Sequence, residues 1–297
     1  MDDRVFVVFN PFSGKGRGRR LVEPVLQALG GGLIEHALTA KAGDEEALAT
    51  QAIQAGFRRI VAVGGDGTWS NVGNAILNSG RADTALGLIA GGTGCDLAKS
   101  LGVPARDVAA AARVVRQGVV RRIDVGRIED RYFLNVAGFG FDIAVIEDSW
   151  TVRWLKGDLV YLYCALRQLR RFPGFEVEIE ADGAAVSKQE LLMFVLANAR
   201  VFGGGFQIAP DADLADGLLD GVVFANMPFL RRLAIMVALL RGRHGAAREV
   251  AVRRAARFRL RFAEPPSYET DGEWRRAQTS ELTVETRPKA LGVLVPA

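Results

Sequence analysis

Short apolar runs rich in β-branched residues alternate with longer amphipathic runs over the first hundred residues. Apolar residues recur at helical spacing in the amphipathic runs, and each run ends near glycine or asparagine, which are common helix stop signals. The pattern predicts helices at Arg20–Leu29, Glu45–Ala55 and Thr68–Leu77. The strands predicted between them are VFVVFN, LIEHALT, RRIVAVGG and ALGLIAGG. This alternation favours a doubly wound α/β domain with a parallel sheet.

The pattern changes after an alanine-rich helix predicted at Ala105–Arg116. Polar and apolar residues now alternate one by one, which is typical of antiparallel strands and indicates a β-sandwich. Helices are also predicted at Leu159–Leu169 and Phe229–Leu240. The alternating segments are FEVEIEADG, ELLMFVLANA, LLDGVVFAN, RFRLRFAE and SELTVET, and a last apolar strand, LGVLVPA, is expected to return to the first sheet. We therefore expect domains at 1–126 and 127–286, followed by a C-terminal strand at 287–297.

Composition is that of a globular protein: 49% of the 297 residues are hydrophobic and 24% are charged, enough for two cores. The only cysteines, Cys95 and Cys164, show no pairing pattern and indicate neither a disulfide framework nor a zinc site. The acidic start, MDDRVFVVFNPFSG, lacks the basic and apolar blocks of a secretory signal. No apolar run approaches the ~18 residues that a membrane-spanning helix needs. We expect a cytoplasmic protein.

Positive charge is concentrated in one segment. Arg231–Arg261 holds ten arginines and one acid, Glu249, so its net charge is +9. The rest of the chain sums to −5, which gives the protein its net charge of +4. Within it, Pro228–Arg243 is predicted to be an apolar helix flanked by arginines, which suits an anionic membrane interface. The alternative, that this helix packs on its own domain, stays open.

Three glycine-rich loops follow three of the predicted strands. In VAVGGDGT, the glycines Gly64, Gly65 and Gly67 would let the backbone approach a phosphate, and a helix begins directly afterwards. Asp66 would repel a bare phosphate, so it indicates a bridging Mg²⁺ or a role in proton transfer. A tight turn closed by an Asx hydrogen bond is the competing interpretation.

The other two loops strengthen the phosphate interpretation. The loop at 10–18, NPFSGKGRG, offers Ser13, Lys15 and Arg17 to a phosphate, and GGTGCD at 91–96 follows the ALGLIA strand. All three loops should lie at one edge of one parallel sheet, where such sheets bind nucleotides. Neither a Walker A sequence nor a G-x-G-x-x-G fingerprint is present.

The order of motifs along the chain resembles the diacylglycerol kinase and sphingosine kinase family, most closely its bacterial diacylglycerol kinase branch. The resemblance covers nearly the whole chain. It rests on NPFSG, GGDGT and GTGCD, on Ile123–Val125, on FLNVAGFGFD at 133–142, on ANARVFGGGFQIAPDADLADGLLD at 197–220, and on TDGEW at 270–274. It implies an α/β nucleotide-binding domain of the NAD kinase and diacylglycerol kinase type, a C-terminal β-sandwich that binds lipid, and an active site in the cleft between them.

The same resemblance implies ATP and Mg²⁺ as cofactors and assigns roles to individual residues. Glu273 matches the general base that accepts a proton from the lipid hydroxyl, and Asp66 belongs to the catalytic centre. Positions matching the family's ATP contacts are Asn10, Pro11, Phe12, Ser13, Gly14, Thr39, Gly65, Asp66, Gly67, Thr68, Trp69, Ser70, Asn71 and Thr93. Positions matching metal ligands are Asp66, Asp96 and Asp124 for a Mg²⁺ and water network, and Asp213, Asp216 and the Leu218 carbonyl for a structural metal.

Simpler interpretations of the acids stay open at this point. The aspartates of 213–220 could cap turns, Glu273 could be an exposed hairpin acid beside a strong Asp-Gly turn, and Asp124 could end a strand. The third loop also departs from the family pattern, because Ala90 replaces a proline and Cys95 replaces an asparagine. A thiol cannot replace the donors and acceptor of an amide, so a hydrogen bond near the nucleotide is expected to be missing.

The sequence thus predicts an ATP-dependent kinase that transfers the γ-phosphate to a lipid hydroxyl, most plainly that of diacylglycerol or a related lipid. The alternatives are an NAD kinase, which shares GGDGT, and a catalytically weak lipid-binding or regulatory protein, which Cys95 favours. The expected partners are a lipid with a free hydroxyl, a membrane surface contacted transiently from the cytoplasm, and a second copy in a homodimer. No nucleic acid is expected.

Overall fold

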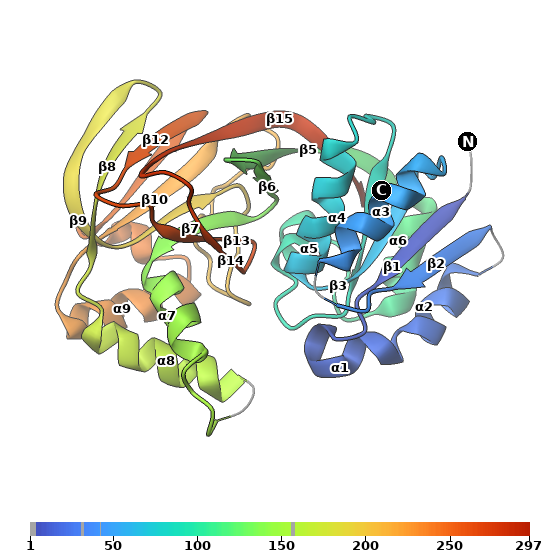
Figure 1. The fold of residues 1–297 in the computed structure, drawn as a ribbon, viewed down its shortest axis with the longest axis horizontal. Helices are drawn as coiled ribbons and strands as arrows, with labels where there is room; N and C mark the ends of the chain where they lie inside the picture. Colours follow the sequence, from blue (N-terminus) through green and yellow to red (C-terminus); the bar gives the residue numbers. More distant parts are fainter. Residues whose placement is uncertain (1–3, 31–32, 42, 156–157) are drawn as a thin grey trace.

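A four-stranded parallel sheet with helices on both faces forms the first domain (Figure 1). The computed structural model describes residues 4–30, 33–41, 43–155 and 158–297; the acidic Asp2 and Asp3 at the chain start lie outside them. The sheet order is β2–β1–β3–β4. The strands are β1 (Val5–Phe9), β2 (Ile34–Leu38), β3 (Arg59–Gly64) and β4 (Ala85–Ala90), and the helices are α1 (Ser13–Arg20), α2 (Val22–Leu29), α3 (Asp44–Gln54), α4 (Asp66–Asn78), α5 (Asp96–Leu101) and α6 (Val108–Gln117).

Strand alternation gives this sheet two buried faces. In β3, Val61 and Val63 pack in the core that holds α2 and α6, whereas Ile60 and Ala62 pack against α3, α4 and α5. Because successive side chains of a strand point to opposite faces, an all-apolar strand needs helices on both sides. The predicted doubly wound arrangement is confirmed.

An antiparallel β-sandwich forms the second domain. Its inner core is aromatic: Phe139 stacks with Tyr268 at a centroid distance of 5.8 Å and with Phe194 at 6.3 Å. Leu169, Ile235 and Leu239 of the helices pack on the outer face of the sheet. The elements are β6 (Arg131–Phe133), β7 (Val136–Gly140), β8 (Phe175–Ala181), β9 (Ala184–Ala197), β10 (Leu219–Ala225), β11 (Val250–Ala255), β12 (Arg257–Arg261), β13 (Ser267–Thr270), β14 (Glu273–Arg276), α7 (Phe141–Ser149), α8 (Asp158–Arg171), α9 (Phe229–Leu240) and a 3₁₀ turn η1 (His244–Ala246).

Two long strands, β5 (Val119–Ile128) and β15 (Glu281–Val295), join the domains across the top of the view in Figure 1. They pair antiparallel along most of their length. The first part of β15 also pairs with β12, and its last part pairs parallel with β4, at Gly292 and Val293. One continuous sheet therefore runs through both domains.

The sequence divided β15 wrongly. SELTVET and LGVLVPA were expected to be two strands, but they are the two ends of one. The register shifts between Arg287 and Leu291, where Lys289 has a φ of +48°. An irregularity of this kind bends a strand without ending it, and a proline and a charged residue at the bend resemble a turn in the sequence.

Most predicted helices agree with the structure to within a few residues, and Phe229–Leu240 matches α9 at both ends. The pattern missed α5 and α7, which are short and begin directly after glycine-rich segments. The hairpin that the Asp-Gly turn beside Glu273 suggested is present as β13–β14. Among the described residues, no helix is both long and apolar enough to cross a bilayer.

Candidate active site

The three glycine-rich loops contact one another through their backbones. Gly14 has a φ of +55°, and a Cβ at this position would lie 2.2 Å from the carbonyl oxygen of Gly91. The amides of Gly91 and Gly92 both donate to the carbonyl of Gly64, at 2.7 and 3.0 Å. No side chain fits between chains this close, so the glycines allow the loops to meet at one edge of the sheet.

The Asn10 side chain fixes the first of these loops. Its Oδ1 accepts hydrogen bonds from the amides of Phe12 and Ser13, at 3.0 and 3.1 Å. Its Nδ2 donates to Glu45 Oε1 at 2.9 Å and to Thr68 Oγ1 at 3.1 Å. Asn10 therefore joins its own loop to α3 and α4. Glu45, which the sequence interpretation missed, is buried, and burial raises the pKa of its carboxyl.

A polar cavity of about 350 Å³ lies between the loops and reaches the second domain. Its lining includes most of the predicted nucleotide contacts. The lining residues are Asn10, Ser13, Gly14, Gly43, Glu45, Gly65, Asp66, Gly67, Thr68, Asn71, Gly92, Thr93, Gly94, Asp271 and Glu273.

Five of the predicted contacts do not line this cavity: Pro11, Phe12, Thr39, Trp69 and Ser70. The Trp69 side chain is fully buried in the core and donates from Nε1 to the Ala62 carbonyl at 3.0 Å. Phe12 is 64% exposed. In α4, residues three or four apart share a face, so the intervening Trp69 and Ser70 point away from the cavity.

Asp66 lies at the start of α4, where the second loop becomes a helix. Its Oδ1 accepts from the Leu97 amide at 3.0 Å. Burial, followed by repulsion from Asp96 and Asp271, raises the Asp66 pKa to about 6. A carboxyl placed among other acids in this way favours a cation nearby.

Asp96 lies close to Asp66, but its carboxylate binds a loop of the second domain. Its Oδ1 lies 2.8 Å from Lys99 Nζ, and its Oδ2 accepts from the Gly204 amide at 2.7 Å. Lys99 Nζ also donates to the Gly204 carbonyl at 2.8 Å. Asp96 and Lys99 thus form a polar link between α5 and the loop at 202–206.

Asp124 does not line the cavity that Asp66 lines, and its part in a Mg²⁺ and water network, which the resemblance implies, stays a prediction. It is fully buried on β5, where Oδ1 accepts from the Lys289 amide and Oδ2 from the Gly217 amide, each at 2.6 Å. Both oxygens are occupied at the junction of β5 with the bend of β15. Among the described residues, no three acidic, histidine or cysteine side chains form a group that could hold a metal ion.

The loop expected to hold a structural metal has arginines beside its acids. Asp216 pairs with Arg254, and Asp213 lies 3.6 Å from Arg121. The Leu218 amide donates to Asp216 Oδ1 at 3.0 Å, which closes an Asx turn. Both carboxylates have an exposed arginine beside them, and the structural metal implied by the resemblance stays a prediction.

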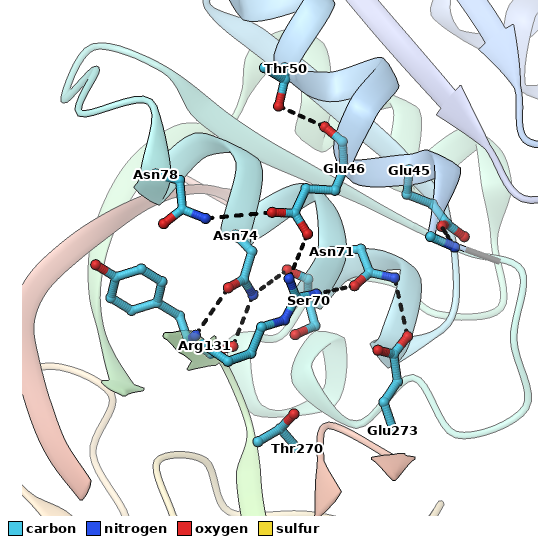
Figure 2. Close-up of polar contacts among 12 residues, drawn as sticks. Glu45, Glu46, Thr50, Ser70, Asn71, Asn74, Asn78, Arg131, Thr270 and Glu273 are labelled. Atoms are coloured by element: carbon cyan, nitrogen blue, oxygen red, sulfur yellow. Dashed lines mark hydrogen bonds and ion pairs between the residues drawn. The ribbon is translucent and has the colours of Figure 1, made fainter. Parts of the chain in front are cut away.

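Glu273, the first residue of β14, lies over the N-terminus of α4. A Cβ on Gly67 would be 3.3 Å from Glu273 Oε1. Asn71 Nδ2 donates to Oε1 at 3.1 Å, as Figure 2 shows, and Arg275 Nη2 donates to Oε2 at 3.2 Å. The side chain is 40% exposed. It is therefore a fixed carboxylate that faces both the solvent and the cavity.

Cys95 lies behind the cavity. It is buried, it has a φ of +55°, and its Sγ is 4.0 Å from the Gly64 carbonyl. Burial, followed by the carboxylates of Asp66 and Asp96, raises its pKa to about 11, so the thiol stays neutral. The thiol packs against the second loop and is not among the groups that line the cavity.

A second cavity of about 740 Å³ opens beside the first and shares Asp66, Thr93, Gly94 and Asp271 with it. Its lining is mainly apolar. The apolar lining residues are Val136, Phe141, Val145, Ile146, Tyr161, Leu162, Ala165, Met193, Phe202, Phe206, Met236 and Leu239. Together the two cavities form a polar chamber and an apolar chamber that meet at buried aspartates.

A buried pair of carboxyl groups, Asp142 and Glu269, lies in the apolar chamber. A Cβ on Gly138 would be 1.8 Å from Asp142 Oδ2 and 3.0 Å from Glu269 Oε1, so both carboxyls lie over this glycine. Burial raises the Asp142 pKa to about 7, and burial together with Asp142 raises the Glu269 pKa. Asp142 ends the FLNVAGFGFD motif, but no local pattern relates it to Glu269, because the two lie on α7 and β13, far apart in the chain.

Two family models match the chain, one over each of its two domains. Residues 4–128 match the diacylglycerol kinase catalytic domain, and residues 135–295 match the YegS C-terminal NAD kinase beta sandwich-like domain.

Individual relatives cover nearly the whole chain. The diacylglycerol kinase of Bacillus subtilis is 33% identical over 277 residues, which are 91% of this chain and 90% of that protein. The crystal structure of a diacylglycerol kinase from Bacillus anthracis superposes with a TM-score of 0.75 at 20% identity, covering 99% of this chain and 97% of that one. An NAD kinase from Archaeoglobus fulgidus, solved in complex with ATP, has a TM-score of 0.53 at 17% identity over 98% and 93% of the two chains.

The Asp124→Asn substitution tests the structural role of the buried carboxylate. An asparagine keeps one acceptor but turns an N–H donor toward one of the two backbone amides, so the free energy of unfolding should fall by about 1–3 kcal/mol. Urea unfolding with a chelator present measures the loss without any contribution from metal. Asp213→Asn, at a side chain 53% exposed, is the control and should change little. Equal stability of the Asp124→Asn protein and the wild type would contradict this role.

The Asp142 carboxyl should make stability depend on pH. Because its pKa is raised in the folded state, the folded protein keeps a proton that the unfolded chain has lost, so stability falls as pH rises through the interval up to about 7. Asp142→Asn removes this loss and should raise the melting temperature on the order of 5 °C near pH 8. Near pH 5 the gain should be smaller. Thermal unfolding at both pH values measures the change in melting temperature, with Asp130→Asn, at an exposed side chain, as control. If the increase in melting temperature of Asp142→Asn were no larger at pH 8 than at pH 5, the raised pKa of Asp142 would be refuted.

Proposed function

Because this chain belongs to the diacylglycerol kinase family, we propose that it is an ATP-dependent lipid kinase that phosphorylates the free hydroxyl of diacylglycerol or a closely related lipid. Kinase activity follows from the family; the use of ATP and the choice of lipid are the proposal. One observation carries it. A polar, glycine-lined cavity and a larger apolar cavity meet at Asp66 and Asp271, which suits a reaction between a phosphate donor and a lipid.

The loops at 10–18 and 64–68 and the loop at 91–96 would bind the phosphates through backbone amides and the N-terminus of α4. Asp66 is the best placed ligand for Mg²⁺. Its Oδ1 accepts from the Leu97 amide. Burial, followed by repulsion from Asp96 and Asp271, raises its pKa, and a divalent cation would relieve that repulsion. The cation would neutralise charge on the phosphates during transfer.

Glu273 would accept the proton of the lipid hydroxyl. Its carboxylate lies over Gly67 at the start of α4, and donors from Asn71 and Arg275 hold its two oxygens. A general base needs a fixed position within hydrogen-bond reach of the hydroxyl, and this placement supports the role. The buried pair of Asp142 and Glu269 would offer hydrogen bonds to the polar end of a lipid whose chains occupy the apolar cavity.

Phosphate transfer from labelled ATP to a panel of lipids, with NAD as a second acceptor, tests the proposal. We expect incorporation into diacylglycerol or a related lipid, and Glu273→Gln should lower turnover by about 10²-fold or more while ATP still binds. Glu176→Gln, at an exposed carboxylate paired with Lys188, is the matched control. Incorporation into NAD alone would favour an NAD kinase, ATP binding without transfer would favour a regulatory protein, and full turnover by Glu273→Gln would remove the proposed base.

A membrane surface would be reached through α8. Six apolar or aromatic side chains of this helix and the segment before it are half or more exposed: Trp150, Trp154, Leu159, Tyr161, Leu162 and Leu166. Tyr161 and Leu162 also line the apolar cavity, so the exposed face is continuous with it. Exposed arginines at 153, 170 and 171 flank this face. Aromatic and aliphatic groups with flanking cations suit the interface of an anionic bilayer.

The arginine-rich segment is less available than its composition suggested. Arg231 pairs with Glu249 at 2.7 Å, and Arg232 is buried, donating to the carbonyls of Leu169 and Phe172, each at 2.9 Å. Ile235 of α9 packs in the outer core of the sandwich. These contacts favour α9 as a packed helix; docking through it, like the homodimer, stays a prediction.

Replacing exposed leucines of α8 tests the membrane proposal. The double variant Leu159→Ser and Leu166→Ser should weaken cosedimentation with phosphatidylglycerol vesicles about tenfold, since two apolar side chains no longer enter the interface. Its stability should change little because both side chains face solvent. Leu33→Ser, 71% exposed on the first domain, is the control. If the double variant bound vesicles as tightly as the wild type and the Leu33→Ser control, docking through α8 would be ruled out.

A further inference from the structure

Arg131 extends from the β-sandwich side into the first domain. It is the first residue of β6, and its side chain is only 13% exposed. Its Nη1 lies 2.5 Å from Glu46 Oε2 on α3, and its Nη2 donates to Asn71 Oδ1 on α4 (Figure 2). One guanidinium therefore contacts two helices of the nucleotide-binding domain.

The contact with Arg131 fixes the orientation of the Asn71 amide. An amide has an acceptor on one side and donors on the other. Because Oδ1 accepts from Arg131, Nδ2 must point the opposite way, where it donates to Glu273 Oε1 at 3.1 Å. A flipped amide would place its oxygen against the Glu273 carboxylate and its NH₂ group against the guanidinium, and both contacts would be repulsive.

Backbone contacts hold Arg131 in register with α4. The neighbouring residue, Tyr132, donates its amide to Asn74 Oδ1 at 3.0 Å and accepts from Asn74 Nδ2 at 2.9 Å. Asn74 lies three residues, nearly one helical turn, after Asn71. The same helix face thus binds β6 and orients the amide, so Arg131 cannot shift without moving Asn74.

We propose that Arg131 is a positioning residue, which acts through Asn71 to hold Glu273 in the geometry needed to receive the proton of the substrate hydroxyl. This inference rests on the proposed role of Glu273. Arg275 holds the other carboxylate oxygen, but it belongs to the same β14 strand as Glu273. Arg131 and Asn71 connect that strand to α3 and α4, so they place the base relative to the nucleotide loops.

Two substitutions separate positioning from structural support. Arg131→Lys keeps a cation for Glu46 but cannot bridge two acceptors in the fixed geometry of a guanidinium. It should lower kcat on the order of 10²-fold, as expected when a reacting group shifts by about 1 Å, with the KM for ATP changed less than about threefold. Glu46→Gln weakens the ion pair but leaves Arg131 bonded to Asn71. Its melting temperature should fall at least as far as that of Arg131→Lys, while it keeps most of its kcat.

Arg58→Met is the matched control, because Arg58 pairs with Asp83 on the surface of the same domain at 3.0 Å. Its kcat should equal that of the wild type. If Arg131→Lys kept its kcat within about twofold, or if Glu46→Gln lost as much kcat as Arg131→Lys, positioning by Arg131 would be wrong.

A double-mutant cycle distinguishes this inference from the proposed function itself. In the Glu273→Gln background, Arg131→Lys should lower the residual rate less than about threefold, because the group it positions is gone. A loss of the same size in both backgrounds would show that Arg131 acts elsewhere. If Glu273→Gln alone had full turnover, the role of Glu273 as the base would be wrong, whatever the effect of Arg131→Lys.

Discussion

The antiparallel pairing of β5 with β15 is the contact on which the relation between the two domains depends. Both strands extend across the two domains in opposite directions, and the C-terminal end of β15 pairs with β4 of the parallel sheet. The bend at Lys289 turns β15 between the two domains, and the buried Asp124 accepts the amide at that bend. Because backbone hydrogen bonds fix the register on both sides, the polar loops are held at a constant distance from the apolar cavity.

The acids around the cavities have two kinds of surroundings: hydrogen-bond donors, or a second carboxyl group. Asp271 accepts three backbone amides from the segment that leads into β7, whereas Asp142 and Glu269 face each other. The first arrangement fixes a loop by satisfying the carboxylate. The second raises the pKa of both carboxyls and leaves Asp142 Oδ2 without a hydrogen-bond partner inside an apolar space. Asp66 combines both, since it accepts the Leu97 amide and lies near other acids, and it lines both chambers.

Local signals predicted a good part of this protein. The alternation of apolar and amphipathic runs over β1 to β4, with glycine-rich loops after β1, β3 and β4, is enough to place three loops at one sheet edge, since parallel strands end together. Motif resemblance located Glu273 and Asp66 at the cavity. It did not indicate the surroundings of Asp124, which are made by Gly217 and Lys289, residues that no local pattern relates to it.

The sequence by itself determined the order of most of the longer strands and helices, the glycine loops and the family, because these depend on neighbouring residues and on short motifs. Only the tertiary structure decided which acids share a chamber, that Trp69 belongs to the core, and that Arg131 reaches Glu273 through Asn71. The reason is physical. Burial, hydrogen-bond partners and pKa are set by groups from distant segments that the fold brings together, and local periodicity carries no information about them.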